Sequence, residues 1–163
     1  MLSVAADNAR MPADFLRPAH PAPGCELCRE SGGALVWQDD GWRVIRIADA
    51  NFPGFYRVVS RQHVAEFSDL DAAARAHAMT LVATVERVLR EALAPTKINL
   101  AALGNMVPHL HWHVIARFDW DSHFPQPIWG TRQREVQPPA ADRLAGPLTS
   151  LDERVAAALS RAT

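Results

Sequence analysis

The chain has 163 residues, with 17 basic and 18 acidic side chains and a formal net charge of -1. A chain of this length can form one domain around its own hydrophobic core. Because the charges nearly cancel, no whole-chain field is expected to attract nucleic acid or an anionic membrane, and neither is an expected partner. The opening stretch MLSVAADNARMPADF lacks the apolar core of a signal peptide, so the sequence predicts a cytoplasmic protein.

Three regions are expected along the chain. Residues 1–24 are rich in alanine and proline and predict an irregular arm, with a short helical turn around Asp14 to Leu16. Residues 25–130 carry the regular apolar patterns of one domain. Residues 131–163 predict a C-terminal extension with a short helix from Ser150, where Ser150 and Glu153 have capping-box spacing.

The domain begins with a predicted antiparallel meander. The stretch ALVWQDDGWRVIRIAD has two apolar runs split by Asp39-Asp40-Gly41, which is typical of a hairpin. The stretch GFYRVVSRQH follows an Asn51-Phe52-Pro53 break and predicts a third strand.

One long helix and two further strands complete the domain. Ser68-Asp69-Leu70-Asp71 resembles a capping box, and apolar residues at helical spacing follow to Leu93, before Pro95. TKINLAAL and VPHLHWHVIARF predict two strands, joined by a loop that holds Gly104, Asn105 and Pro108. The predicted fold class is therefore α+β, an antiparallel sheet of about five strands with one long helix and a C-terminal helix.

The stretch HLHWHV carries the chemistry-bearing residues. His109, His111 and His113 alternate with apolar residues, so on a strand all three share one face. Crowded imidazoles favour neutral forms, which suits either a metal or nucleophilic catalysis. A catalytic zinc held by all three histidines is one alternative, but ligands about 6–7 Å apart in a straight row fit a tetrahedron poorly.

VPHLHWHVIAR resembles the motif of the histidine triad (HIT) superfamily of nucleotide hydrolases and transferases, and the order of elements from Cys25 to Arg117 is similar to that family. The resemblance implies a HIT-like fold, a nucleotide substrate and a homodimer paired through the long helix and the neighbouring strand. It implies that His111 attacks the α-phosphorus to form a covalent nucleotidyl intermediate, and that His113 belongs to a hydrogen-bond relay. Dinucleoside polyphosphates and nucleoside phosphoramidates are the implied substrates.

The same resemblance implies further nucleotide-binding residues. Asn99 and Asn105 match positions near the ribose or phosphate, and backbone amides around Gly104 could donate to the phosphoryl group. Asp49 and Asn51 lie where the family holds the ribose. Ile45 and Ile47 could line a base pocket. For each of these residues, an ordinary turn or strand position is the alternative.

The only cysteines, Cys25 and Cys28, form a Cys-x-x-Cys motif. In a reducing compartment such a pair points to metal binding or redox chemistry more than to a disulfide. Some HIT proteins and galactose-1-phosphate uridylyltransferase relatives join such a motif to two histidines, which here correspond to His63 and His109. The implied cofactor is a closed, structural zinc, with no cofactor needed for the chemical step. A cysteine pair without metal is the alternative.

Several departures limit the resemblance. The family's small hydroxyl residue is replaced by Met106 and Val107, and Phe55 stands where small phosphoramidases have a histidine. A zinc-stabilised nucleotide-binding or signalling module with little turnover is therefore the rival function. Arg117 could reach a polyphosphate, although an exposed strand-end arginine is the simpler expectation. Four residues after the last predicted strand could form an aromatic lid or a dimer contact: Trp120, His123, Phe124 and Trp129. His20 and His77 are expected to be solvated surface histidines.

Overall fold

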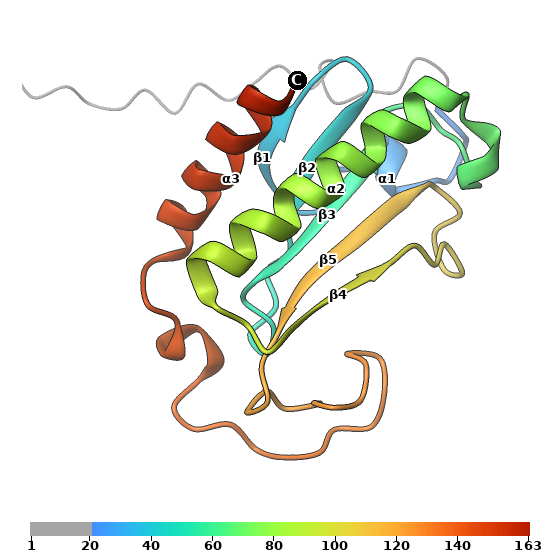
Figure 1. Ribbon diagram of the computed structural model, residues 1–163. Coiled ribbons are helices and arrows are strands. Elements are labelled where there is room, and N and C mark those ends of the chain that lie inside the picture. Colours follow the sequence, from blue (N-terminus) through green and yellow to red (C-terminus); the bar gives the residue numbers. More distant parts are fainter. Residues whose placement is uncertain (1–20) are drawn as a thin grey trace, which may run out of the picture.

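The computed structural model describes residues 21–163, so the predicted turn at Asp14 to Leu16 and His20 lie outside the described residues. An antiparallel sheet of five strands, in the order β1-β2-β3-β5-β4, forms the centre of the molecule (Figure 1). The strands are β1 (Ala34–Gln38), β2 (Trp42–Arg46), β3 (Phe55–Ser60), β4 (Lys97–Ala101) and β5 (His111–Arg117). The predicted α+β fold is confirmed.

Two long helices, α2 (Ala72–Leu93) and α3 (Leu148–Ala162), pack against each other and against the sheet (Figure 1). The helix α1 (Glu26–Arg29) has a single turn and lies beside the sheet, and 3-10 turns form at Phe67–Asp69 and Ala140–Arg143. Within residues 21–163, none of the helices has the length and apolar character that crossing a membrane requires.

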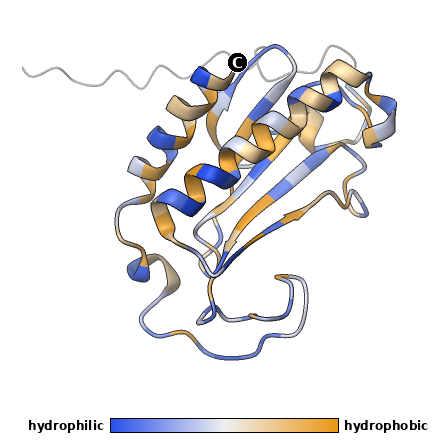
Figure 2. Ribbon diagram, in the orientation of Figure 1, coloured by the Kyte–Doolittle hydropathy of each residue, from blue (hydrophilic) through white to orange (hydrophobic). Residues whose placement is uncertain are grey.

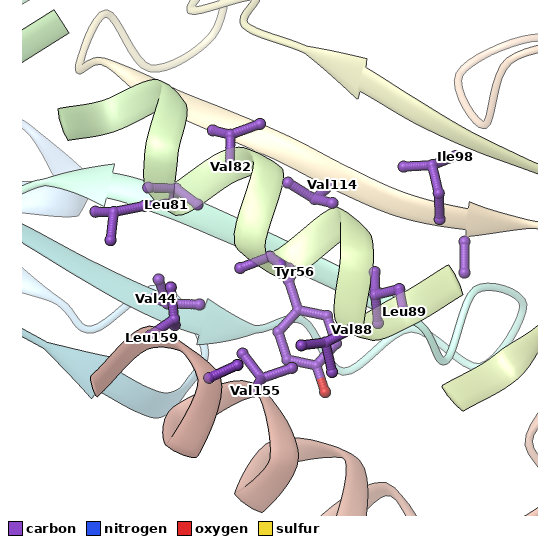
Figure 3. Packing of buried hydrophobic residues seen from close by; sticks show 14 of the residues in the cluster. Val44, Tyr56, Leu81, Val82, Val88, Leu89, Ile98, Val114, Val155 and Leu159 are labelled. Atoms are coloured by element: carbon purple, nitrogen blue, oxygen red, sulfur yellow. The ribbon is translucent and has the colours of Figure 1, made fainter. Parts of the chain in front are cut away.

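The main core lies between the helices and one face of the sheet. Hydrophobic and hydrophilic residues alternate along the helices and strands (Figure 2), and apolar side chains of α2 and α3 meet alternate residues of the strands (Figure 3). Tyr56 is fully buried among them, and its hydroxyl donates to Asp152 of α3 at 2.7 Å. Because strand side chains alternate between faces, this packing leaves the other face of β3 and β5 free for chemistry. Labelled core residues in Figure 3 include Val44, Leu81, Leu89, Val114, Val155 and Leu159.

Both predicted helix starts are displaced in the structure. The cap of α2 is Asp71, whose carboxylate accepts a hydrogen bond from the Ala74 amide at 2.8 Å, whereas Ser68 belongs to the preceding 3-10 turn. Helix α3 begins directly after Pro147, so Ser150 already lies within its first turn. Each prediction placed the start at a plausible serine. Asp71 caps α2 with its carboxylate, whereas Pro147 stands before α3 and makes no capping hydrogen bond through its side chain.

The predicted hairpin between β1 and β2 is confirmed. One carboxylate oxygen of Asp39 accepts from the amides of Gly41 and Trp42, at 2.8 and 2.7 Å. The other oxygen lies 2.6 Å from Nε2 of His77 on α2. His77 is partly exposed, as the sequence suggested for a surface histidine, but the fold also brings a carboxylate from a distant hairpin against it.

Candidate active site and metal site

The histidine strand presents its triad on the face opposite α2 and α3. Strands β3 and β5 are antiparallel partners, and their register places Arg57 opposite His113 and Val59 opposite His111. Since facing residues on neighbouring strands share one side of the sheet, these four side chains line a common surface. All three triad histidines are buried.

The imidazole of His111 is held in one tautomer. Its Nδ1 lies 2.6 Å from the backbone carbonyl oxygen of His109. A carbonyl oxygen can only accept, so Nδ1 carries the proton and donates it. The other nitrogen, Nε2, therefore carries the free lone pair. Burial lowers the pKa of His111, helped by the positive charge of Arg57, although the bond to His109 opposes the shift. The side chain is thus a neutral imidazole with an available nucleophilic nitrogen.

His113 is enclosed by other rings. Its ring centroid lies 4.8 Å from that of His111, 5.5 Å from that of Phe55 and 5.1 Å from that of Trp129. Burial, with the charges of His111 and Arg57 acting in the same direction, lowers the pKa of His113 to about 3. Across residues 21–163, the buried Nδ1 of His113 has no hydrogen-bond partner. The hydrogen bond that sets the tautomer of His111 therefore comes from the backbone of His109 and not from His113.

The four residues that the sequence suggested as metal ligands come together. The ligand atoms of Cys25, Cys28, His63 and His109 all lie within 4.8 Å of one another. Nδ1 of His109 is 3.5 Å from each sulfur, and Nδ1 of His63 is 3.4 Å from Sγ of Cys28. Bonds of about 2.3 Å to sulfur and about 2.0 Å to nitrogen place such atoms about 3.5 Å apart around a tetrahedral zinc. The donor set and its spacing fit zinc.

The surroundings of His109 suit a metal ligand. Its Nε2 donates to the carbonyl oxygen of Ser60 at 2.7 Å, which leaves the Nδ1 lone pair directed at the two sulfurs. Burial lowers the pKa of His109 to about 4, and the neutral form is the one that binds a metal. Such an outer hydrogen bond fixes ring orientation in many metal sites.

A buried arginine holds the cysteine turn in place. Arg43 of β2 is fully buried and donates to the carbonyl oxygens of Leu27 and Glu30 at 2.7 and 3.4 Å. Burial raises the pKa of the Cys28 thiol, and the charge of Arg43 opposes that shift. Arg43 therefore both anchors α1 and offsets negative charge at the two sulfurs.

The side chains of Asn99 and Asp49, which were expected to bind the nucleotide, form hydrogen bonds with residues other than the triad histidines. Asn99 faces Ile115 across the sheet, on the triad side, but its side-chain oxygen accepts from Arg117 at 2.7 Å. The carboxylate of Asp49 accepts from the amides that follow it at Asn51 and Phe52. Gly104, with a φ of 72°, and the exposed Asn105 lie in the loop between β4 and β5.

The expectation of an exposed Arg117 is wrong. Its side chain is 1% exposed and forms an ion pair with the equally buried Asp121, with Nε 2.7 Å from a carboxylate oxygen. The guanidinium also donates to the carbonyl of Gln126, and Asp121 accepts from the amides of His123 and Phe124. These bonds satisfy the charge inside the protein and fix the loop that follows β5.

The predicted aromatic lid divides into separate parts. Trp120 stacks on Phe118 with centroids 4.6 Å apart and is covered by Arg143, which places it against the helix-side core. Trp129 packs edge-on against His113 and is 53% exposed. Of the predicted lid residues, Trp129 is therefore the one that borders the triad.

Sequence reasoning missed Arg57 and Arg43. Both lie on strands with charged residues between apolar ones, and a period of two counted through GFYRVVS would have placed Arg57 on the face shared with the triad. How deeply each guanidinium is buried depends on α1 and on the loop after β5, which cover this face of the sheet. The local sequence pattern around Arg43 and Arg57 does not predict that covering.

Residues 29–120 match the HIT domain family. A histidine triad protein from Bradyrhizobium japonicum is 35% identical, with a TM-score of 0.61 over 80% of this chain and 90% of that one. A histidine triad protein from Marinobacter aquaeolei is 25% identical, with a TM-score of 0.64 over 82% and 93%. A zinc-bound histidine triad family protein from Mycobacterium smegmatis shares the fold at 17% identity, with a TM-score of 0.52 over 79% and 85%. No curated protein matches the chain.

Proposed function

Because this chain belongs to the HIT family, we propose that it is a nucleotide hydrolase or nucleotidyl transferase that acts at the α-phosphate through a covalent intermediate on His111. Membership of the family supports a nucleotide-binding hydrolase or transferase kind of function. The observation that carries the finer proposal is the 2.6 Å hydrogen bond from Nδ1 of His111 to the carbonyl of His109. It leaves Nε2 as the only ring nitrogen with a lone pair for attack.

The proposed reaction has two displacements. Nε2 of His111 forms a bond to the α-phosphorus, and the bond from phosphorus to the leaving group breaks with its electron pair going to the leaving group. The oxygen of water, or of another acceptor, then attacks the same phosphorus. The nitrogen–phosphorus bond breaks, its electron pair returns to Nε2, and the attacking hydroxyl loses its proton. The substrates are a dinucleoside polyphosphate or a nucleoside phosphoramidate, and the chemical step needs no metal.

Zinc is the proposed structural cofactor. Cys25, Cys28, His63 and His109 would hold it, and four protein ligands leave no open position for substrate. Bound there, zinc supplies a cross-link between the cysteine turn, the end of β3 and the start of β5. The zinc-bound relative from Mycobacterium smegmatis shares this fold and supports the assignment.

The experiment that tests the proposal compares wild type with His111→Asn. Both are assayed with diadenosine polyphosphates and with adenosine phosphoramidate, and the wild type is also quenched in alkaline denaturant during turnover for intact-mass measurement. We expect a nucleotidyl adduct on wild type and a loss of at least about 10³-fold in kcat for the variant. His77→Gln, which changes a histidine on α2 outside the site, serves as the control. Equal activity of His111→Asn and wild type would overturn the proposal.

The rival function has one observation in its favour. Met106 is 92% exposed, and neither it nor Val107 offers a hydroxyl to a phosphate. A zinc-stabilised nucleotide-binding module would bind the same nucleotides with little turnover. Nucleotide binding by wild type and by His111→Asn, without an adduct or product from either, would favour this function.

We also infer that two copies pair through α2 and β4. Strand β4 is an edge of the sheet, and Leu100 on it is 42% exposed. An unpaired edge with an apolar side chain favours pairing with a second strand. Sedimentation of wild type is expected to give a dimer, and Leu100→Glu a monomer. A monomeric wild type would contradict the inference.

A further inference from the structure

We propose that Arg57 binds a second anionic group of the nucleotide, beyond the phosphate that His111 attacks, so that the site prefers nucleoside polyphosphates to nucleoside phosphoramidates. The inference rests on the proposed function, which leaves both substrate classes open. It assigns to Arg57 a role in selecting the substrate, separate from the nucleophilic role of His111.

The position of Arg57 is fixed by the sheet and by an aromatic ring. It lies directly opposite His113 in the β3–β5 register and is partly buried. Its guanidinium carbon is 5.5 Å from the centroid of Phe55, whose ring packs against His113 at 5.5 Å. Stacking on an aromatic ring restricts a long flexible side chain. The guanidinium is therefore held beside the triad on the sheet face that carries it.

Arg57 lacks the hydrogen-bond partners of the two buried arginines on this face, Arg43 and Arg117. Arg43 donates to carbonyl oxygens of the α1 turn, and Arg117 is paired with Asp121. Within the described part of the chain, Arg57 forms no hydrogen bond or salt bridge. Its Nε is buried without an acceptor, as are Nε and Nη1 of Arg43, but Arg43 has two carbonyl acceptors for its other terminal nitrogen. Burial lowers the pKa of Arg57, and Glu26 on α1 opposes the shift. A guanidinium still carries its charge in proteins, so this site holds a partly buried positive charge that no carboxylate of the described residues pairs with in a salt bridge.

A partly buried guanidinium without a salt-bridge partner gains from an anion that a ligand brings to it. The guanidinium fork matches the oxygens of a phosphate and can form two parallel hydrogen bonds with it. A phosphoramidate presents a single phosphate and releases a neutral amine. A polyphosphate presents the same α-phosphate and also a charged phosphate next to it, which becomes the leaving group. Only the polyphosphate offers Arg57 a second anion, so the arginine discriminates between the two classes.

The test measures binding of nucleotides that differ by one phosphate. Calorimetry gives the Kd of adenosine monophosphate and adenosine diphosphate for wild type, Arg57→Leu and Arg57→Lys, with uridine nucleotides as a second pair. Arg154→Leu removes the same charge from an exposed position on α3, on the helix side of the sheet, and serves as the control. Circular dichroism and thermal melting verify folding, and Arg57→Gln replaces Arg57→Leu if the leucine variant does not fold.

We expect wild type to bind the diphosphate more tightly than the monophosphate. Arg57→Leu should weaken diphosphate binding by about 10- to 100-fold and monophosphate binding by less than about threefold. Arg57→Lys should give an intermediate loss, because it keeps the charge but not the fork. Equal losses for both nucleotides would overturn the inference in favour of an α-phosphate contact. Unchanged binding of both would overturn it in favour of packing on Phe55 alone.

Failure of this inference can be told apart from failure of the proposed function. A diphosphate preference that depends on Arg57, in a protein without turnover, keeps the inference and overturns the enzymatic proposal. Turnover through His111 with kcat/KM for polyphosphates and phosphoramidate reduced equally by Arg57→Leu keeps the enzymatic proposal and overturns the inference. Binding of neither nucleotide by wild type would overturn both.

Discussion

Nδ1 of His111 donates its proton to the backbone carbonyl of His109, two residues earlier on the same strand. The side chain of His109 points instead to the sulfurs of Cys25 and Cys28, and its Nε2 is bonded to the carbonyl of Ser60. One residue therefore takes part in both sites, with its side chain at the metal ligands and its carbonyl at the proposed nucleophile. A metal that positions His109 would also position the group that orients His111.

Removal of the proposed structural zinc is expected to lower stability before it abolishes chemistry. Chelation with phenanthroline, or the substitution Cys28→Ser, should lower Tm by more than about 5 °C, because four ligands from separate parts of the chain lose their cross-link. Metal content, thermal melting and kcat are measured on the same protein, purified without a histidine tag. A catalytic zinc would instead give lost activity at unchanged Tm. Freshly reduced protein without zinc would contradict the metal assignment.

The buried ion pair of Arg117 and Asp121 is expected to dominate the stability of the loop after β5. Asp121→Asn leaves a guanidinium that is 1% exposed without its counter-ion, and should lower the free energy of unfolding by about 3–5 kcal/mol. Urea unfolding measures the loss. Glu135→Gln breaks the ion pair with Arg132, whose side chain is 41% exposed, while that of Glu135 is 82% exposed. This variant should lower the free energy of unfolding by less than about 1 kcal/mol. Similar losses in the two variants would contradict this interpretation.

How much the sequence could predict differs between the fold and the site. Alternation and turn residues predicted all five strands and the meander, because hydrophobic period and turn chemistry are local. Spacing and family resemblance predicted the four candidate metal ligands, whose ligand atoms the fold brings together. The partners of Arg117 and His77 were not predicted, because a buried charge depends on which carboxylate the complete fold brings to it. Arg57 was missed for the same reason, since its lack of a partner is visible only once its neighbours are placed.

The histidine strand is expected to make stability depend on pH. Burial lowers the pKa of His113 in the folded state to about 3, below the value of about 6.5 in the unfolded chain. The unfolded state therefore binds the proton first as the pH falls. The stability that depends on a neutral His113 is present in full above pH 6.5. As the pH falls from 6.5 towards 3, the free energy of unfolding decreases by up to about 1.4 kcal/mol per pH unit.

The variant His113→Asn tests this dependence. Urea unfolding of wild type and variant between pH 7.5 and 4.5 gives the difference in free energy of unfolding at each pH. We expect the advantage of wild type over the variant to shrink as the pH falls. The comparison cancels the effect of protons on the cysteine and histidine ligands, which both proteins share. A difference that stays constant over the range would show that His113 titrates normally in the folded protein.

Trp129 is expected to form one wall of the nucleotide site. It packs edge-on against His113 with centroids 5.1 Å apart, yet it is 53% exposed, so much of the indole remains available to a base or leaving group. Trp129→Ala should raise KM by about 5- to 100-fold, as expected for loss of one stacking contact. It should change kcat by less than about threefold, because the ring contact of Trp129 is with His113 and an indole supplies no charge to the reacting group.

Trp37→Ala provides the matched control for this substitution. Trp37 lies on β1 and donates to Ser160 of α3 at 3.1 Å, so its loss removes an indole from the helix side of the sheet. The Tm of Trp37→Ala should fall, while its KM should equal that of wild type. Steady-state kinetics and thermal melting of both variants separate the two effects. If Trp129→Ala lowers Tm as Trp37→Ala does and leaves KM unchanged, Trp129 only packs on His113 and takes no part in substrate binding.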